Sequence, residues 1–267
     1  MPVKVIVAGV LGRMGREITQ IVLADNQMVL AGCIDRPDNA FIGRDIGEII
    51  SGTPCGIQVL ASLKNLDVTD SVIIDFTAPE ASIAHARDTE GTNCAMVIGT
   101  TGMTADQIAI LKKSAEKRAI LLSPNTSVGV NFLFQLTKLA AEKLGEGFDI
   151  EIIEAHHHLK KDSPSGTAVR LAEVAAEAIG TTYDEAVRNG RSGIVGERTK
   201  KEIGMHAVRG GDIVGEHTVL FAGMGEKIEL HHVMTSRSTL AHGAIRCAKF
   251  MNKKSAGWYS MADVLGL

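Results

Sequence analysis

Cysteine is scarce in this sequence, and the few cysteines present are not grouped. The 267 residues contain four, Cys33, Cys55, Cys94 and Cys247, with no paired spacing among them. A zinc site built from cysteines needs two closely spaced pairs, so this spacing argues against one. Unpaired cysteines are typical of free thiols in a reducing compartment.

The chain also lacks a large net charge and a long apolar run. Its formal net charge is −3, whereas a general nucleic-acid binder carries a strongly basic face. The N-terminal run, MPVKVIVAGVLGRMG, is too short and too rich in glycine for a signal peptide, and no stretch reaches the length of a membrane span. We therefore expect a cytoplasmic protein that binds neither nucleic acid nor membrane.

Alternating strand and helix patterns run through the first half of the chain. Short apolar runs at 3–8, 28–34, 71–76, 94–98 and 119–122 are separated by helical patterns, among them 79–89 and 104–117. Repeated β-α units of this length predict an α/β domain with a parallel, doubly wound sheet of the Rossmann type. Residues 36–60 lack periodicity, and we expect a surface excursion there with little regular structure.

Three glycines follow the first strand and lead into a helical pattern. Gly9, Gly12 and Gly15 have the spacing G-x-x-G-x-x-G, with Leu11 where the commoner dinucleotide fingerprint has its second glycine. The pattern fits a dinucleotide site, and it also fits a tight strand-to-helix turn with close packing. The context of strand, turn and helix is the one that a dinucleotide site requires.

The second strand ends in an acidic and a basic residue that bear on the cofactor. Asp35 lies at the distance from the glycines where an acidic side chain receives the ribose hydroxyls of an adenosine. Asp35 repels a 2′-phosphate, whereas Arg36 can pair with one. We therefore expect the protein to accept both NADH and NADPH.

Three more strand exits are polar or rich in glycine. Ligands of doubly wound sheets bind outside the carboxyl ends of the strands, which is the edge where the fingerprint glycines lie. The segments predicted at this edge are Phe76-Thr77, Gly99-Thr100-Thr101-Gly102 and Ser123-Pro124-Asn125-Thr126. Their convergence favours a ligand site over simple turns.

The second half of the chain has a different pattern. A helix is predicted over 127–145, a half-buried strand over 148–153, and strand-like runs at 203–209, 213–222 and 227–236. We expect an α+β domain over 128–237 with a mixed, mainly antiparallel sheet of four strands. A helix at 238–251 is expected to return to the first domain, which then comprises 1–127 and 238–267. One helix layer leaves a sheet face bare, and a homo-oligomer interface would cover it.

The densest chemistry lies in EAHHHLKKDSPSGTA, residues 154–168. Three histidines and two lysines precede Asp162 at the end of a predicted strand. The next helix begins near Ser165, where free N–H groups and the helix dipole favour an anion. The loop thus predicts a site that binds and protonates an anion. The histidines lack the i, i+4 spacing of a zinc helix, so we expect no metal, and a solvated basic loop is the alternative.

Together these motifs resemble the dihydrodipicolinate reductase family, now named 4-hydroxy-tetrahydrodipicolinate reductase, of lysine and diaminopimelate biosynthesis. The resemblance covers essentially the whole chain, and the EAHH-x-x-K-x-D-x-PSGTA string is its most specific part. The other segments that carry it, in chain order, are VAGVLGRMGR, IDFTAPE, VIGTTG, SPNTSVGVN, VRGGDIVGEHTV and SR-x-x-x-A-x-GA.

The resemblance implies an oxidoreductase that reduces 4-hydroxy-tetrahydrodipicolinate to tetrahydrodipicolinate with NAD(P)H and loss of water. It also implies a homotetramer built by the second domain. The family's catalytic residues fall on His156 and Lys160, and its contacts with the dicarboxylate substrate fall on His157, Ser165, Gly166 and Thr167. Its cofactor contacts fall on Gly9, Val10, Leu11, Gly12, Arg13, Met14, Asp35, Arg36, Gly99, Thr100, Thr101, Ser123, Pro124, Asn125 and Thr126.

Two other functions fit part of the sequence. Another Rossmann oxidoreductase of small dicarboxylates, such as a semialdehyde dehydrogenase, needs a nucleophilic cysteine, and no cysteine lies at an expected site. A non-catalytic NAD(P) sensor would explain the first domain but has no use for the loop of histidines and lysines. The histidines at 217, 231 and 232 lie within strand-like runs and are expected to be packed or surface residues.

Overall fold

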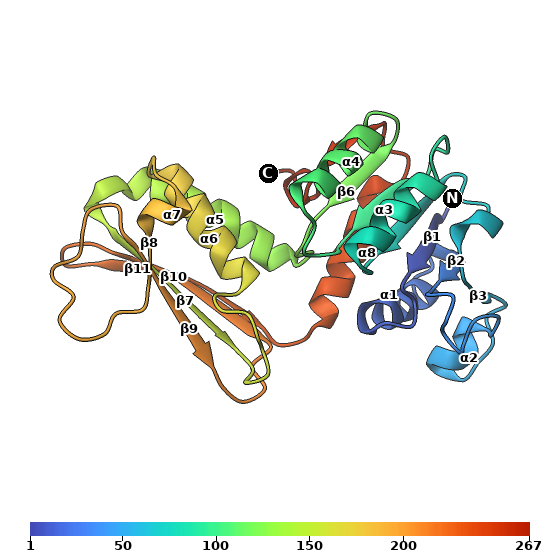
Figure 1. The fold of residues 1–267 in the computed structure, drawn as a ribbon, viewed down its shortest axis with the longest axis horizontal. Coiled ribbons are helices and arrows are strands. Elements are labelled where there is room, and N and C mark those ends of the chain that lie inside the picture. The colour runs from blue at the N-terminus through green and yellow to red at the C-terminus, as the bar shows by residue number, and fades with distance from the viewer. The chain divides into compact units, whose positions relative to one another are not determined.

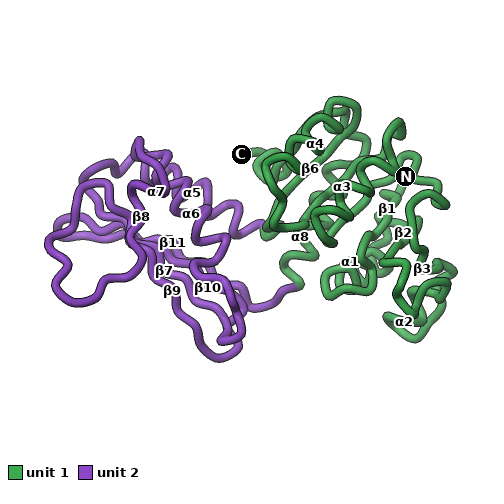
Figure 2. The backbone as a smooth tube through the Cα atoms, viewed as in Figure 1, with its two compact units in different colours: residues 1–127, 238–267 green, residues 128–237 purple.

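A computed structural model describes residues 1–267, and the chain forms two compact units. Unit 1 comprises Met1–Ser127 and Ser238–Leu267, and unit 2 comprises Val128–Arg237 (Figure 2). Unit 2 is therefore an insertion into the chain of unit 1. None of the helices in either unit combines the length and the apolar character needed to cross a membrane.

Unit 1 contains a seven-stranded parallel sheet with the order β12-β6-β5-β4-β1-β2-β3. Among its strands, Figure 1 labels β1, β2, β3 and β6. The central strands are buried along almost their whole length, which explains why they are continuous apolar runs without alternation. The predicted doubly wound α/β sheet is confirmed. The strands are β1 (Val3–Ala8), β2 (Met28–Ile34), β3 (Val59–Leu60), β4 (Ser71–Asp75), β5 (Ala95–Ile98), β6 (Ala119–Leu122) and β12 (Gly257–Tyr259).

The helices of unit 1 come from both ends of the chain. α8 packs beside α1 and against β4 and β5, while α3 packs against α4. α8 approaches the segment after β6 so closely that a Cβ at Gly243 would collide with the carbonyl of Thr126. The helices are α1 (Arg13–Ala24), α2 (Ile46–Ser51), α3 (Pro79–Asp88), α4 (Ala105–Ala115), α8 (Ser238–Met251) and α9 (Met261–Leu265), with a 3₁₀ turn, η1, at Leu63–Asn65.

The 36–60 segment has more regular structure than the sequence predicts, because it contains α2 and β3. One side chain, Asp45, organises it. Its carboxylate caps α2 by accepting the N–H groups of Gly47 and Glu48, and it also accepts those of Cys55 and Gly56 in the turn that follows. A six-residue helix held by one cap gives too little periodicity to be found from sequence.

Unit 2 contains a mixed five-stranded sheet with the order β11-β10-β7-β9-β8. β10 is antiparallel to both β7 and β11, whereas β9 is parallel to β7 and β8. The predicted mixed sheet is confirmed, but the prediction of four strands missed the short β8. The strands are β7 (Asp149–His156), β8 (Val187–Asn189), β9 (Ile203–Arg209), β10 (Gly215–Ala222) and β11 (Lys227–Met234).

Helices of unit 2 cover one face of this sheet. α5 (Val128–Leu144) packs against α6 (Gly166–Ala178), and the short α7 (Tyr183–Ala186) follows, with a 3₁₀ turn, η2 (Gly145–Gly147), after α5 (Figure 1). The core between helices and sheet contains Ile152, Leu171 and Phe221, each 0% exposed. On the opposite face, the strand register aligns Val208, Ala155, Glu216 and Val233 in one row across four strands.

Candidate active site

The connection from β7 to α6 carries the predicted catalytic residues. His156 is the last residue of β7, and Ser165 is the N-cap of α6. The Ser165 side chain accepts the N–H of Ala168 at 3.2 Å. Gly166 and Thr167 are the first two residues of a 13-residue helix. The N–H groups of this first helical turn and the helix dipole favour a carboxylate there, as the sequence predicts.

The sheet register brings further polar residues to His156. Alternate residues of a strand share a face, so Glu154 lies on the same face of β7 as His156. Glu154 is paired with His217 of β10, and His156 is paired with Arg209 of β9. The next residue on that face of β10 is Gly215, whose missing side chain leaves room for the imidazole. A Cβ at Gly215 would lie 3.1 Å from Nε2 of His156.

Glu154 is the central acceptor of this cluster. Its carboxylate is fully buried and lies 2.7 Å from Nδ1 of His156. Both terminal nitrogens of Arg209 donate to it, at 2.7 and 2.8 Å, and the N–H of Ser165 donates at 3.0 Å. Burial alone would raise the pKa of Glu154, but the hydrogen bonds from Arg209, His156 and Ser165 lower it overall. Glu154 is therefore ionised at neutral pH.

The environment of His156 favours release of a proton. Burial lowers its pKa below the usual 6.5, and the hydrogen bond to Glu154 offsets part of that effect. Because Nδ1 is bound to Glu154, Nε2 is the nitrogen left for a ligand. His156 thus has the geometry of a general acid whose second nitrogen is anchored.

His217 also belongs to this cluster, which the sequence did not indicate. Its ring lies edge-on to that of His156 with 5.3 Å between centroids, and its Nε2 lies 3.1 Å from Oγ of Ser165. Burial lowers the pKa of His217 to about 4. The expectation of a packed strand histidine is correct for burial, but the side chain packs within the site as a neutral imidazole.

The lysine of the loop is paired within the loop. Nζ of Lys160 lies 2.9 and 2.8 Å from the two carboxylate oxygens of Asp162, and its side chain is 20% exposed. Arg209 binds the carbonyl of Asp162 at 2.8 Å and so fixes this turn. The hydrogen bond from Lys160 is the largest of the effects that lower the pKa of Asp162.

The neighbouring histidines have separate contacts. Nε2 of His157 lies 3.4 Å from a terminal nitrogen of Arg237. Nδ1 of His158 lies 2.8 Å from the carbonyl of Gly211, and the N–H of His158 also donates to that carbonyl. His158 therefore fastens the loop to the turn after β9, whereas His157 lies beside the guanidinium of Arg237.

Several residues predicted to bind the dinucleotide line a cavity of about 580 Å³ in unit 1. Gly9, Leu11 and Gly12 line it from the turn after β1, and Asp35 and Arg36 line it from the end of β2. Gly9 has φ +71, which favours glycine, and a Cβ there would meet a methyl group of Thr77 at 2.8 Å. These residues fit the adenosine portion of a dinucleotide, because backbone approaches the cavity closely beside an acidic side chain.

Hydrogen bonds hold two of the polar side chains that line this cavity, Asp35 and His85. The N–H of Leu11 donates to Asp35 at 2.8 Å, which fixes the carboxylate beside the glycine turn. His85 of α3 also lines the cavity, and its Nδ1 lies 2.8 Å from the fully buried carboxylate of Asp75. Sequence reasoning did not single out His85, because a lone histidine in a helical pattern gives no signal.

The remaining predicted cofactor residues do not line this cavity. Val10, Arg13 and Met14 belong to the same β1–α1 junction, while the segments 99–101 and 123–126 follow β5 and β6. Thr100 is buried, and its hydroxyl lies 2.9 Å from that of Ser82. Thr126 donates to the carbonyl of Leu240 at 2.7 Å. The structure thus brings the exits of β1, β2 and β4 together at the cavity, which Phe76 and Thr77 also line, and places the exits of β5 and β6 farther along the same sheet edge.

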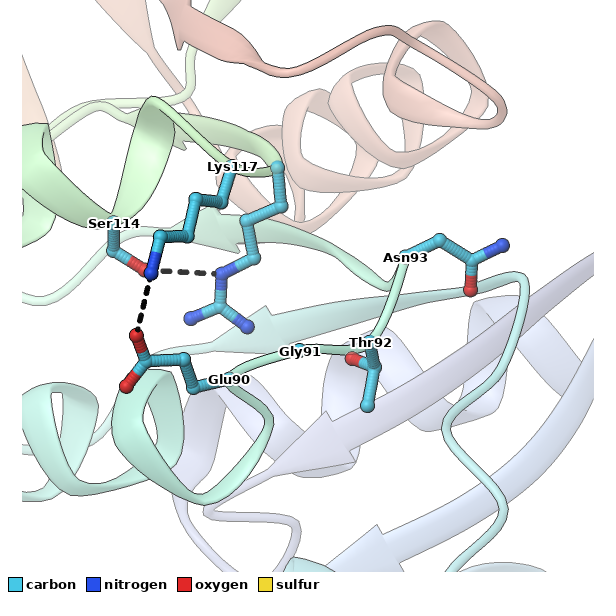
Figure 3. A pocket seen from close by; sticks show the side chains of 7 residues that line it. Glu90, Gly91, Thr92, Asn93, Ser114 and Lys117 are labelled. Atoms are coloured by element: carbon cyan, nitrogen blue, oxygen red, sulfur yellow. Dashed lines mark hydrogen bonds and ion pairs between the residues drawn. The ribbon is translucent and has the colours of Figure 1, made fainter.

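A second hollow in unit 1, of about 270 Å³, has a structural explanation. Lys117 pairs with Glu90 at 3.3 Å across it (Figure 3). Arg118 is buried beneath and donates to the carbonyls of Ala86 and Thr89 at the end of α3. Its guanidinium therefore satisfies carbonyls at the negative end of a helix, and none of the predicted site residues lines this hollow.

Two family models match the chain and together cover nearly all of it. The model described as dihydrodipicolinate reductase, N-terminus, matches residues 3–126, and the one described as dihydrodipicolinate reductase, C-terminus, matches residues 129–265. The boundary between the two models falls at the boundary between units 1 and 2.

Relatives and a solved structure agree with these models. The 4-hydroxy-tetrahydrodipicolinate reductase of Anaeromyxobacter dehalogenans (strain 2CP-1) is 47% identical over 264 residues, which is 99% of this chain and 98% of that protein. The enzyme of the same name from Ruegeria pomeroyi is 47% identical over 263 residues, 98% of each chain. A dipicolinate-bound dihydrodipicolinate reductase from Paenisporosarcina sp. TG-14 has a TM-score of 0.77 and 25% identity, and the match covers 98% of this chain and 99% of that one.

Proposed function

We propose that cofactor binding and substrate binding are divided between the two units of this chain, which belongs to the dihydrodipicolinate reductase family. The members of this family are oxidoreductases of lysine and diaminopimelate biosynthesis. The reaction is the reduction of 4-hydroxy-tetrahydrodipicolinate to tetrahydrodipicolinate with NAD(P)H and loss of water. Unit 1 binds the cofactor at the cavity beside Gly9 and Asp35. Unit 2 binds the dicarboxylate at the β7–α6 connection and supplies the proton.

The observation that carries this proposal is the anchoring of His156 beside the start of α6. NAD(P)H supplies the hydride when bound. Nε2 of His156 then donates a proton to the reduced ring, while the N–H groups at Gly166 and Thr167 hold one carboxylate. Lys160 exchanges its contact with Asp162 for the second carboxylate or the ring nitrogen, and stabilises its charge.

The cysteines do not support the alternative of a covalent dehydrogenase. Cys33, Cys94 and Cys247 are buried. Burial raises the pKa of both the Cys33 and the Cys247 thiols to about 12, so neither provides a thiolate nucleophile at neutral pH. The thiol-dependent reaction is therefore set aside in favour of reduction with proton donation from unit 2.

We further propose that the helix-free face of the sheet in unit 2 assembles a homotetramer. Val208 and Val233 are 48% and 46% exposed in the row that crosses this face. Burial of such side chains between sheets of different copies would remove apolar surface from water. Light scattering should give four times the 28.4 kDa mass of one chain, and a monomer mass would contradict the proposal.

Arg36→Ala should weaken NADPH binding more than NADH binding. Arg36 lines the cavity next to Asp35 and its nearest acid, Asp38, is 3.9 Å away, so its guanidinium can turn to a 2′-phosphate. A loss of about 1–3 kcal/mol in the binding free energy of NADPH is the scale of a charge-assisted hydrogen bond. Titration of both cofactors checks it, with Arg44→Ala as the matched control outside the cavity. Equal losses for NADH and NADPH would show that Arg36 does not contact the phosphate.

Pyridine-2,6-dicarboxylate should inhibit competitively with the substrate, because its two carboxylates match the loop cations and the start of α6. Thr167→Val should weaken this inhibition by removing a hydroxyl from the first turn of α6. Thr181→Val, beyond the far end of that helix, is the matched control. Inhibition that competes only with the cofactor would move the dicarboxylate site out of unit 2.

A further inference from the structure

We propose that Glu154 and Arg209 are positioning residues for the proton donor. The Glu154 carboxylate, held by Arg209, keeps a hydrogen on Nδ1 of His156, leaves Nε2 for the substrate, and ties the imidazole to the first turn of α6. The inference rests on the proposed role of His156 as the proton donor, and it adds the groups that set the state of that residue.

The hydrogen bonds around Glu154 require an ionised carboxylate. An ionised carboxylate only accepts, at about four lone-pair positions. Four contacts surround this one: Oε2 faces Nδ1 of His156 and Nη1 of Arg209, and Oε1 faces Nη2 of Arg209 and the N–H of Ser165. A proton on either oxygen would point at one of these donors. A charge buried in this way needs a counter-ion, and Arg209 provides it in a bidentate pair.

The same contacts determine the tautomer of His156. Because Glu154 has no hydrogen to donate, Nδ1 of His156 must be the donor in their 2.7 Å contact. In the neutral ring Nε2 then carries only a lone pair, and in the charged ring Nε2 holds the second proton. Proton release and uptake are thereby confined to Nε2, which faces the space opened by Gly215.

Glu154 is also the one group around His156 that favours its charged form. The other charged or titratable groups facing the ring are Arg209 from β9, His217 from β10 and Lys160 from the loop. Arg209 and Lys160 each lower the pKa of His156, and His217 is neutral. Without the carboxylate, burial and two cations would leave His156 with little affinity for the proton that it must deliver.

Ser165 extends the effect of Glu154 to substrate binding. Its N–H contact with Oε1 joins the strand that carries the acid to the helix start that holds a substrate carboxylate. One carboxylate thus fixes the separation between proton donor and anion site. The other contact of Ser165 in this cluster, between its Oγ and Nε2 of His217, reaches β10 and not β7.

Glu154→Gln provides the test, because an amide has the shape of the carboxylate but must place an NH₂ donor against existing donors. If the NH₂ faces His156, Nδ1 becomes the acceptor and the neutral tautomer moves its hydrogen to Nε2. If it faces Ser165, the helix start loses its acceptor. In either case the negative charge beside His156 is lost, so we expect a lower pKa of His156 and roughly a 10²-fold fall in turnover number. With the NH₂ toward His156, imidazole ¹⁵N NMR spectra should also show the changed tautomer. The His156→Gln variant identifies the signal.

Two further variants separate positioning from general damage. Arg209→Gln removes a cation near His156, so the pKa of His156 should rise, opposite to its fall in Glu154→Gln. Glu151→Gln is the matched control, since Glu151 lies on the other face of β7 and binds Arg191, Arg198 and His206 in a similar ion cluster. It should leave the pKa and tautomer of His156 unchanged.

The outcomes distinguish the inference from the function on which it rests. An unchanged pKa of His156 in Glu154→Gln would overturn the inference, whatever the activity. If the pKa falls as expected but His156→Gln retains full turnover, the role of His156 as proton donor fails and the link from Glu154 to His156 stands. Restoration of the pKa in Glu154→Asp would support the carboxylate as the cause.

Discussion

His156→Gln should lower the turnover number by about 10²–10⁴-fold, the usual contribution of a general acid. Glutamine keeps a hydrogen-bonding group near Glu154 but has no proton to transfer at neutral pH. Substrate affinity should change less, because the proposed binding mode assigns the carboxylates to Lys160 and the first turn of α6. Steady-state kinetics check the result, with His158→Gln as the matched control, since His158 binds a loop carbonyl and faces no proposed substrate group.

The dependence of kcat/KM and kcat on pH provides a second test of His156 as the proton donor. A proton donor must be charged, so kcat/KM should fall as pH rises through the pKa of His156 in the free protein, which burial places below 6.5. Two substrate carboxylates would favour the imidazolium, so the corresponding limb in kcat should lie at higher pH. Both limbs should be absent in His156→Gln. Full activity of the His156→Gln variant would show that the proton donor does not lie in this loop.

Lys160→Ala should also lose turnover steeply, by about 10²–10³-fold, which is the scale for loss of one preorganised donor at a centre of developing charge. Lys160 is held against Asp162 in a turn that Arg209 fixes, so its ammonium is near its working position before the substrate binds. Lys161→Ala, one residue farther along the loop, is the control and should retain most activity.

Cofactor titration on the same variants identifies the unit that is affected. The glycine turn and Asp35 lie in unit 1, so Lys160→Ala should bind NADH as well as the unaltered protein does. Loss of NADH binding would show that Lys160 acts on the cofactor and not on the substrate. A small effect on turnover with a large rise in KM would assign Lys160 to substrate binding in the ground state alone.

Local signals explain what the sequence predicted correctly. Each long strand of unit 1 is a continuous buried run, and the carboxyl ends of neighbouring parallel strands meet at one edge, so Gly9 and Asp35 were predicted to lie together. The strands β3, β8 and β12 have two or three residues, which is too short for a period to be recognised. The role of Asp45 could not be predicted either. Its hydrogen bonds reach as far as Gly56, and such bonds do not affect the spacing of hydrophobic residues.

Long-range pairing explains what the sequence did not predict at the site. Glu154 opens the most distinctive motif, but its role depends on Arg209, 55 residues away in the chain, and on a register between β7 and β9 that no local pattern specifies. His217 lies in β10, which follows β9 in the chain. Its position opposite Glu154 follows from the pairing of β10 with β7. The loop residues could therefore be singled out from the sequence, but the groups that contact Glu154 and His156 from other strands could not.

The insertion of unit 2 has a consequence for synthesis of the protein on the ribosome. Unit 2 is one continuous segment, whereas the core of unit 1 includes Ala241, Ala244 and Cys247 of α8, each 0% exposed. Residues 1–127 must therefore wait for α8 while unit 2 is made, for roughly 6–25 s at a translation rate of 5–20 residues per second. During that interval the apolar face of α1, β4 and β5 lacks its cover and is open to chaperones or to other nascent chains. Unit 2 can finish folding first, although it comes second in the chain.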